Sequence, residues 1–388
     1  MTHDVRGVMK VADRPSTVMV EGHGSWLWDA DGKRYLDFVQ GWAVNCLGHA
    51  PAVIAETLAT QARRLINASP AFYNEPMARL AALLADTSGL AEVFPCNSGA
   101  EANEGAIKLA RKWGARHRDG AFEIVTMEHA FHGRTLATMA ASGKPGWDAL
   151  FEPKVPGFPK IPMGDVDALE RVLTPRTVAV MLEPIQGEAG VLPASDEWLR
   201  HVRRMTRERG LLMILDEVQT GIGRTGRMYG YEHAGIEPDI ITLGKGLGGG
   251  VPIAALVAAE AASCFEYGDQ GGTFNGNSLM AAVACAVVET VRAPGFLETV
   301  TATGRYLTER LERLSADKGH GSVRGRGLLL ALALRDRDAP KVARDAMDRG
   351  VLINAPRPDT LRFMPALTVT REEIDHMIDV LSASLEHA

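Results

Sequence analysis

Short apolar runs alternate with amphipathic stretches through the middle of the chain, from about residue 51 to residue 285. One complete unit begins at Ser195, a residue typical of a helix start, and the helix is predicted to end at Gly210. The apolar run up to Leu215 is short and uninterrupted, as in strands that are buried on both faces of a parallel sheet. Repeated helix-then-strand units therefore predict an α/β fold, with a mostly parallel sheet covered by helices on both faces.

The two ends of the chain follow other patterns. Near the N-terminus, an Asp-Gly step at residues 31–32 separates alternating apolar residues, which predicts a β-hairpin. Towards the C-terminus, residues 328–334 form a strand-like run, and Thr370 with Glu373 forms a capping box before a helix. These changes predict an N-terminal segment that packs with the small domain, a large domain and a smaller α+β domain, at residues 1–50, 51–285 and 286–388.

Two predicted strands end next to residues with a clear chemical use. Asp216 follows the run that ends at Leu215, and Lys245 comes after the run Ile240–Leu243. Open α/β proteins bind ligands beyond the carboxyl ends of their strands, so both side chains are expected at one rim. A lysine that faces an acid suits pyridoxal phosphate, because the lysine forms a Schiff base and the carboxylate keeps the pyridine nitrogen protonated. Taken singly, the lysine also fits a solvated loop and the acid a turn or a cap.

A third motif predicts a phosphate site. Ser98, Gly99 and Ala100 lead from a short apolar stretch into a predicted helix. Such small residues let a phosphate approach free N–H groups at the positive end of the helix dipole, although a serine cap without a ligand has the same pattern. Further along, Phe131 could stack on a cofactor ring and Arg134 could bind a carboxylate; a core phenylalanine and a surface arginine are the alternatives.

Composition and charge exclude several other classes of protein. A length of 388 residues suits a two-domain soluble enzyme, and the net charge of -6 argues against a broad nucleic-acid-binding surface. No apolar run reaches the roughly 18 residues that a membrane span needs, and the first residues lack the apolar core of a secretory signal. The four cysteines lie far apart without a CxxC pair, which predicts a reduced, cytoplasmic protein without a metal site.

Several long stretches together resemble the class III (fold type I) pyridoxal-phosphate-dependent aminotransferases, over nearly the whole chain. The stretches are CNSGAEANEGAIKLARK (96–112), FHGRTLAT (131–138), LEPIQGEAGV (182–191), LDEVQTGIGRTG (215–226) and LGKGLGGGVPI (243–253). Within that class, the chain is most similar to the N-acetylornithine aminotransferases. The resemblance implies a large domain with a mostly parallel seven-stranded sheet and a smaller α+β C-terminal domain joined by the N-terminal segment.

The same resemblance implies how the cofactor is bound. Lys245 would bind it covalently and serve as general base, and Asp216 would pair with the pyridine nitrogen. Val218 and Phe131 would pack on opposite faces of the ring, and Gln219 would hydrogen-bond its phenolic oxygen. The implied phosphate-binding residues are Ser98, Gly99, Ala100 and, from the other subunit, Thr273. Because one of these comes from a partner, the resemblance implies a homodimer with shared active sites.

For the substrates, the resemblance implies a ping-pong transfer of the terminal amino group of N-acetylornithine to 2-oxoglutarate. The products would be N-acetylglutamate semialdehyde and glutamate, as in arginine biosynthesis. Arg362 would bind the α-carboxylate of glutamate, Glu188 would pair with that arginine when the donor is bound, and Arg134 would take the distal carboxylate. Ornithine aminotransferases place a tyrosine at the position of Gly41, so glycine leaves room for an acylated donor.

Other substrates and reactions fit the same motifs. The alternatives are another ω-aminotransferase (for N-succinylornithine, ornithine, 4-aminobutyrate or a diamine), an aminomutase, or a non-catalytic binding protein, which the intact Lys245 argues against. Trp42, Asn275 and Ser278 differ from the residues usual in acetylornithine enzymes. Trp42 narrows or reshapes the donor pocket if it points inward, whereas it only packs if it points outward, and packing is the favoured interpretation.

Overall fold

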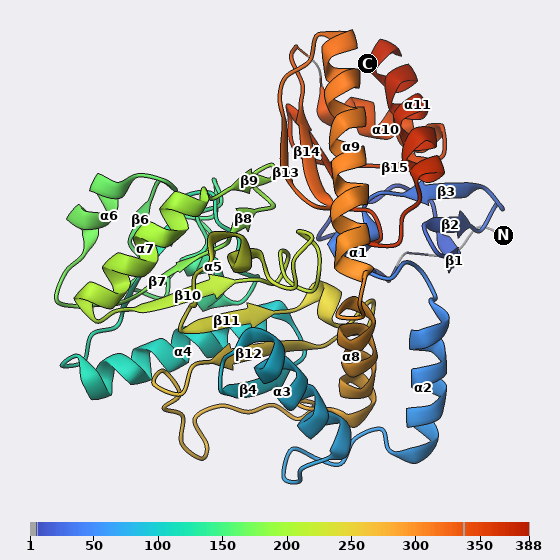
Figure 1. The fold of residues 1–388 in the computed structure, drawn as a ribbon. Helices are drawn as coiled ribbons and strands as arrows, with labels where there is room; N and C mark the ends of the chain where they lie inside the picture. The colour runs from blue at the N-terminus through green and yellow to red at the C-terminus, as the bar shows by residue number, and fades with distance from the viewer. Residues whose placement is uncertain (1–4, 6, 337, 388) are drawn as a thin grey trace.

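The computed structural model describes residue 5, residues 7–336 and residues 338–387. These residues form a larger, lower body and a smaller, upper body in Figure 1. The middle of the chain builds the lower body, and the N-terminal strands lie beside the C-terminal region in the upper one (Figure 1).

A seven-stranded sheet forms the centre of the larger body. Its strands, from edge to edge, are β4 (Glu92–Cys96), β12 (Ala254–Ala258), β11 (Ile240–Leu243), β10 (Leu212–Asp216), β7 (Thr177–Leu182), β5 (Glu123–Met127) and β6 (Lys160–Ile161). Strand β12 is antiparallel to both of its neighbours, and the other neighbouring strands are parallel. The predicted mostly parallel, seven-stranded sheet is confirmed.

Helices cover both faces of this sheet. Helix α4 (Gly99–His117) packs against β11 and β12, and helix α7 (Asp196–Arg209) packs against β7 and β10. Alternate residues of β10 belong to the two resulting cores, with Leu212 on the α4 side and Met213 on the α7 side. Because side chains alternate across a strand, a strand between two helical layers must be apolar throughout. This explains the uninterrupted run in the sequence.

The predicted ends of helix α7 are confirmed. Ser195 is its N-cap and accepts the N–H of Trp198 at 3.0 Å. Gly210 ends the helix in the left-handed conformation, with a φ of 59°. The chain then enters β10 directly, so these local signals fix where Asp216 leaves the sheet.

The smaller body contains two further sheets. An antiparallel sheet consists of β13 (Val323–Arg326), β14 (Leu329–Ala333), β17 (Thr360–Phe363) and β16 (Asn354–Arg357). The other consists of β1 (Met19–His23), β2 (Trp26–Asp29), β3 (Arg34–Asp37) and β15 (Val351–Leu352). The predicted hairpin is β2–β3, and β3 pairs in parallel with β15 from the C-terminal region.

Three helices complete the smaller body: α9 (Phe296–Lys318), α10 (Ala339–Asp348) and α11 (Arg371–His387). The capping box before α11 is present, since Thr370 and Glu373 exchange side-chain to backbone hydrogen bonds at 3.0 and 3.2 Å. The remaining elements are α1 (Gln40–Ala43), α2 (Ala52–Arg64), α3 (Glu75–Ser88), α5 (Leu136–Ala141), α6 (Val166–Val172), α8 (Ser278–Val291), β8 (Ile185–Gln186), β9 (Leu192–Pro193) and the 3₁₀ turns η1 (Gly230–Ala234) and η2 (Lys245–Leu247).

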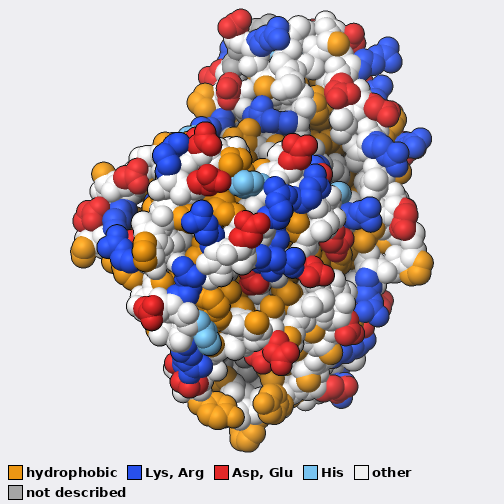
Figure 2. All heavy atoms as spheres, turned by 60° about the vertical axis from the view of Figure 1, so that its left-hand side comes forward, with side chains coloured by type: hydrophobic (Ala, Val, Ile, Leu, Met, Phe, Trp, Pro, Cys, Tyr) orange, Lys and Arg blue, Asp and Glu red, His pale blue; other side chains and the backbone are white. Residues whose placement is uncertain are grey.

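The surface and the core agree with the composition. On the face shown in Figure 2, Lys and Arg side chains are interspersed with Asp and Glu side chains. Taken singly, no helix in the described ranges is long and apolar enough to cross a membrane; only the bent pair α8–α9 passes by length and composition. All four cysteines are free and buried.

Candidate active site

A cavity of about 260 Å³ lies at the carboxyl edge of the central sheet. Five strands that run in the same direction, β4, β5, β7, β10 and β11, each end beside it, whereas the antiparallel β12 does not. The cavity is lined by Gly99, Ala100, Asn103, Phe131, His132, Gly133, Arg134, Glu183, Asp216, Val218, Gln219 and Lys245. The sheet therefore brings together residues that are up to 146 positions apart in the chain, as the rule for open α/β sheets predicts.

Asp216 is held rigidly at the base of this cavity. Its Oδ2 accepts hydrogen bonds from Asn103 Nδ2 and His132 Nδ1, both at 2.8 Å, and its Oδ1 accepts the N–H of Val218 at 3.0 Å. Thr242 donates to Asn103 Oδ1 at 2.7 Å, which orients that amide. Three donors fix the orientation of this carboxylate and hold its charge in one place.

The partner histidine responds to this charge. Burial of His132 opposes its protonation, but the hydrogen bond to Asp216 and the charge of that carboxylate outweigh burial and raise the pKa of His132. Sequence patterns alone assigned no role to His132 or Asn103. Asn103 could have been found from the helical pattern. It lies one turn after Gly99 and is the polar residue on a buried face of α4 that is otherwise made of Gly, Ala, Ile and Leu.

Lys245 faces the same cavity from the turn after β11. Its backbone has a φ of 42°, which is uncommon for a residue other than glycine and is characteristic of functional sites. Burial lowers the pKa of the Lys245 ammonium, and the nearby charges of Glu188 and Asp216 only partly oppose this effect. Within the described ranges, the Lys245 amine has neither a hydrogen bond nor an ion pair. A buried amine of this kind is suited to exist in its neutral, nucleophilic form.

The opposite end of the cavity is the N-terminus of helix α4. Ser98 is the N-cap, and its Oγ accepts the N–H of Glu101 at 3.2 Å. Gly99 and Ala100 line the cavity in the first turn, where a helix leaves its N–H groups without internal partners. With 19 residues, α4 is long enough for a full helix dipole, so this end attracts an anion.

The side walls of the cavity are aromatic and amide groups. Phe131 lines it, and its N–H donates to Glu183 Oε1 at 2.9 Å. Burial raises the pKa of Glu183 to about 8. On the other side, Gln219 approaches so closely that a Cβ on Gly187 would lie 1.6 Å from its Oε1. A side chain at position 187 would therefore displace the Gln219 amide from its present position.

Beyond Gln219 lies a buried ion pair. Arg362 is fully buried, and its Nη1 donates to Glu188 Oε1 at 2.8 Å and to Gln219 Oε1 at 3.5 Å. Its Nε donates to Asn354 at 2.8 Å, while Nη2 has no partner among the described residues. Burial raises the pKa of Glu188, but the charge and hydrogen bond of Arg362 outweigh it and hold that pKa below its usual value.

Trp42 covers the face of this arginine. The Arg362 guanidinium lies 5.5 Å from the centre of the indole ring, within the range of a cation–π contact. Gly41 and Trp42 both have left-handed backbone angles, with φ values of 60° and 66°. Half of Trp42 is exposed. The ring also contacts Arg362, a predicted substrate-binding residue, so the interpretation of Trp42 as packing alone was incomplete.

Thr273 lies outside the lining of the cavity, in an exposed loop before α8. Asn275 in the same loop accepts a hydrogen bond from Asn97 at 2.7 Å, next to the predicted phosphate site. Ser278 is the buried first residue of α8. The predicted cofactor residues other than Ser98 and Thr273 line the cavity, and Ser98 caps the helix that begins there. The assignment of Thr273 to a partner subunit stays a prediction.

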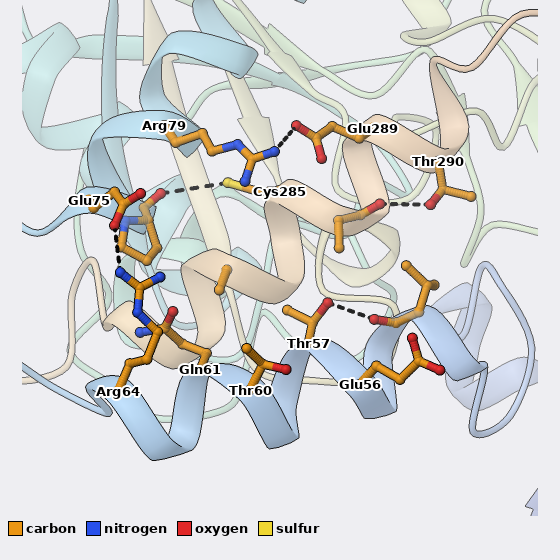
Figure 3. A pocket seen from close by; sticks show the side chains of 14 residues that line it. Glu56, Thr57, Thr60, Gln61, Arg64, Glu75, Arg79, Cys285, Glu289 and Thr290 are labelled. Carbon is orange, nitrogen blue, oxygen red and sulfur yellow. Dashed lines mark hydrogen bonds and ion pairs between the residues drawn. The ribbon is translucent and has the colours of Figure 1, made fainter.

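A larger cavity of about 590 Å³ lies between α2, α3 and α8 (Figure 3). Four of its charged side chains form two pairs, Arg64 with Glu75 at 3.1 Å and Arg79 with Glu289 at 2.5 Å (Figure 3). Size alone does not indicate chemistry. The smaller cavity contains the buried lysine, the fixed carboxylate and the free helix terminus, so we assign the active site there.

Comparison with known proteins agrees with this geometry. The sequence profile of the family "Aminotransferase class-III" matches residues 8–385. The chain belongs to the class-III aminotransferases. It is 56% identical over 391 residues to the "Acetylornithine aminotransferase" of Ralstonia nicotianae, covering 99% of this chain and 98% of that protein. It is also 55% identical to the "Acetylornithine aminotransferase 2" of Bordetella bronchiseptica, covering 97% and 96%.

Solved structures of two other aminotransferases have the same fold. The ornithine aminotransferase of Toxoplasma gondii superposes with a TM-score of 0.94 at 31% identity, covering 98% of this chain and 93% of that one. The N-acetylornithine aminotransferase of Stenotrophomonas maltophilia superposes with a TM-score of 0.84 at 34% identity, covering 96% of both chains. The class uses pyridoxal phosphate, and this chain is therefore a pyridoxal-phosphate-dependent transaminase.

The residues of the cavity fit this cofactor. An unpartnered buried amine at Lys245 suits its aldehyde, the fixed Asp216 carboxylate suits its pyridine nitrogen, and the α4 terminus at Gly99 suits its phosphate. When bound, pyridoxal phosphate supplies a ring that takes up the electron pair of the substrate bond being broken.

The protein residues supply the remaining chemistry of the aminotransferase. Asp216 would keep a proton on the pyridine nitrogen, and the His132 and Asn103 hydrogen bonds hold that carboxylate in place. Lys245, whose pKa is lowered by burial, would take the proton from the reacting substrate carbon. The amides at the start of α4 would anchor the phosphate and so keep the reacting atoms in register.

Proposed function

We propose that this class-III aminotransferase transfers the terminal amino group of N-acetylornithine to 2-oxoglutarate and forms N-acetylglutamate semialdehyde and glutamate. The observation that carries the proposal is the buried pair between Arg362 and Glu188, at the end of the cavity beyond Gln219. The acetylornithine aminotransferases at 55–56% identity support the choice of donor.

The two substrates make opposite demands on this pair. Glutamate reacts at a carbon that carries a carboxylate, whereas the donor reacts at a terminal carbon without one. An arginine placed for glutamate would be left with an unpaired, desolvated charge when the donor is bound, which is unfavourable. Glu188 resolves the conflict, because it neutralises Arg362 in one half-reaction and moves aside for the glutamate carboxylate in the other. The free Nη2 of Arg362 gives that carboxylate a second donor.

The far end of the substrate is proposed to meet Arg134. Its guanidinium lies 5.9 Å from the Phe131 ring at the rim of the cavity and is exposed, so it can accept a carboxylate from either substrate. Gly41 lies next to Trp42 with a φ of 60°, and a Cβ at this position would lie 3.4 Å from Asn45 Nδ2 and 3.7 Å from Val44 Cβ. Its lack of a side chain leaves room for the acetyl group.

The decisive experiment is a single-turnover titration of the pyridoxal-loaded enzyme with separate donors. We expect N-acetylornithine to discharge the lysine-bound cofactor band much faster than ornithine, N-succinylornithine or 4-aminobutyrate. A slow response to N-acetylornithine beside a fast response to another amine would keep the family and overturn the donor. Discharge and recovery by one substrate alone, without 2-oxoglutarate, would instead support an aminomutase.

Replacement of Glu188 by Gln tests the proposed switch. A hydrogen bond to a charged partner contributes about 1.5–3 kcal/mol, so kcat/KM for N-acetylornithine should fall roughly 10- to 100-fold. The glutamate half-reaction should be unchanged or faster, since the substrate carboxylate replaces Glu188 there. Stopped-flow rates of the two half-reactions measure this difference. Glu237→Gln removes an acid whose side chain is 87% exposed and serves as the control; equal losses in both half-reactions would contradict the switch.

We also propose that the enzyme works as a cytoplasmic homodimer in which Thr273 of one subunit completes the phosphate site of the other. Phe274 next to it is 61% exposed, and Phe72 and Tyr73 are 68% and 93% exposed. Apolar rings exposed to this degree are typical of an interface. Sedimentation of the holoenzyme should give about twice the chain mass of 41.8 kDa, and a monomer that is fully active would rule the proposal out.

A further inference from the structure

A tight turn holds Lys144 and Trp147 together at the rim of the active site. The sequence Lys144-Pro145-Gly146-Trp147 has proline at the second position and glycine at the third, with a φ of 82° for the glycine. The N–H of Trp147 donates to the carbonyl of Lys144 at 3.2 Å, which closes the turn. These are the features of a type II turn, in which the third residue requires a positive φ. The side chains of Lys144 and Trp147 therefore start from a fixed relative position.

The Trp147 indole is the shared platform for two cations. Its ring lies 5.4 Å from Lys144 Nζ and 4.9 Å from the Arg134 guanidinium carbon. The Phe131 ring, which lines the cofactor cavity, lies 5.7 Å from the same indole. Trp147 itself is only 7% exposed, so the platform is part of the core. The arrangement places Lys144 beside the arginine proposed to bind the distal carboxylate of the substrate.

Among the described residues, these two cations have no anionic partner. Neither Lys144 nor Arg134 forms an ion pair within the described ranges, whereas Arg64 and Arg79 in the cavity of Figure 3 are each paired with a glutamate. Two positive charges on one indole repel each other, and a cation–π contact offsets this only in part. A pair of unneutralised cations at the rim of a cavity is therefore arranged for an anionic ligand.

The pKa of Glu188 is consistent with a position of Lys144 near the substrate site. Burial raises the pKa of Glu188, and Lys144 is among the positive charges, after Arg362 and Lys245, that lower it. Lys144 is thus near enough to the substrate site to act electrostatically on Glu188.

We propose that Lys144 is a second carboxylate-binding residue of the substrate site. Together with Arg134, it binds the carboxylate remote from the reacting carbon, which is the γ-carboxylate of glutamate or 2-oxoglutarate and the α-carboxylate of the acylated donor. Both cations contact the indole of Trp147, and in the proposed complex one carboxylate contacts both. This inference rests on the proposed function, and it adds Lys144 to Arg134 and Arg362 as a residue that binds the substrate.

The test uses binding as well as turnover. In the holoenzyme, Lys144→Met should raise the Kd of glutarate and the KM for the oxo-acid acceptor about 3- to 10-fold, with kcat within roughly twofold, because the contact is made equally in the ground and transition states. The Kd of butyrate, which lacks the second carboxylate, should not change. Lys144→Arg should restore most of the affinity for glutarate. Isothermal titration calorimetry measures both Kd values.

The control is Lys341→Met, which removes an exposed lysine from α10. Unchanged glutarate affinity in Lys144→Met would overturn the proposal, and so would an equal loss of affinity for butyrate, since that indicates general damage to the site. Lys144→Gln repeats the measurement if the methionine variant does not fold. Because glutarate binding does not depend on the amino donor, failure of N-acetylornithine as a substrate would overturn the proposed function and leave this result intact.

Discussion

Lys245→Ala is expected to abolish measurable transamination. Loss of the proton transfer alone lowers the rate by about 10²- to 10⁴-fold, and loss of the covalent link to the cofactor adds to this. The structural reason is that Lys245 is the lysine that lines the cavity, where burial lowers its pKa and its amine has no partner in the described part of the chain. Turnover of N-acetylornithine and of glutamate should fall together, because both half-reactions use the same base.

A separate measurement distinguishes this loss from misfolding. Borohydride reduction should attach the cofactor to the wild-type enzyme and to Lys341→Ala, an exposed-lysine control, but not to Lys245→Ala. Mass spectrometry of the intact protein detects the attachment. Cofactor that is still fixed at another residue, or activity within tenfold of the wild type, would contradict the assignment of Lys245.

Asp216→Asn is expected to have the next largest effect. Removal of one charge that stabilises the reacting system typically lowers kcat by about 10²- to 10³-fold. The neutral amide can still occupy the space between Asn103 and His132, so the fold and the phosphate end at Gly99 should be preserved. Single-turnover rates measure the loss of activity, and thermal unfolding checks that the fold is preserved. Asp167→Asn, at an exposed position of α6, is the control.

The same variant should change the titration of His132. In the wild type, Asp216 raises the pKa of His132 above its ordinary value of 6.5 in spite of burial. The stability that comes from this protonated histidine is therefore fully present below pH 6.5 and is lost as the pH rises through the raised value. In Asp216→Asn the part of this pH-dependent component that Asp216 provides should disappear, and the His132 pKa should fall, because burial is then opposed by Glu183 and no longer by Asp216. Histidine NMR titration of both proteins checks the direction; an unchanged His132 pKa would contradict the pairing.

Local signals in the sequence determined the elements and the strand ends. Ser195 and Gly210 bound α7 through contacts within a few residues, and the apolar run to Leu215 reports burial on both faces of the strand. Such features depend on helix caps and on side-chain alternation, which a linear pattern records directly. For the same reason, the sequence already placed Asp216 and Lys245 at the ends of two strands, and motif resemblance added their roles.

Only the tertiary structure decided which distant residues meet these strand ends. His132 and Asn103 reach Asp216 from 84 and 113 positions away, and β15 joins β3 across most of the chain. The antiparallel direction of β12 and the contact of Trp42 with Arg362 are equally absent from local patterns. Such contacts depend on strand order and on how layers pack. Periodicity reports which face of an element is buried, but not which residue lies opposite it.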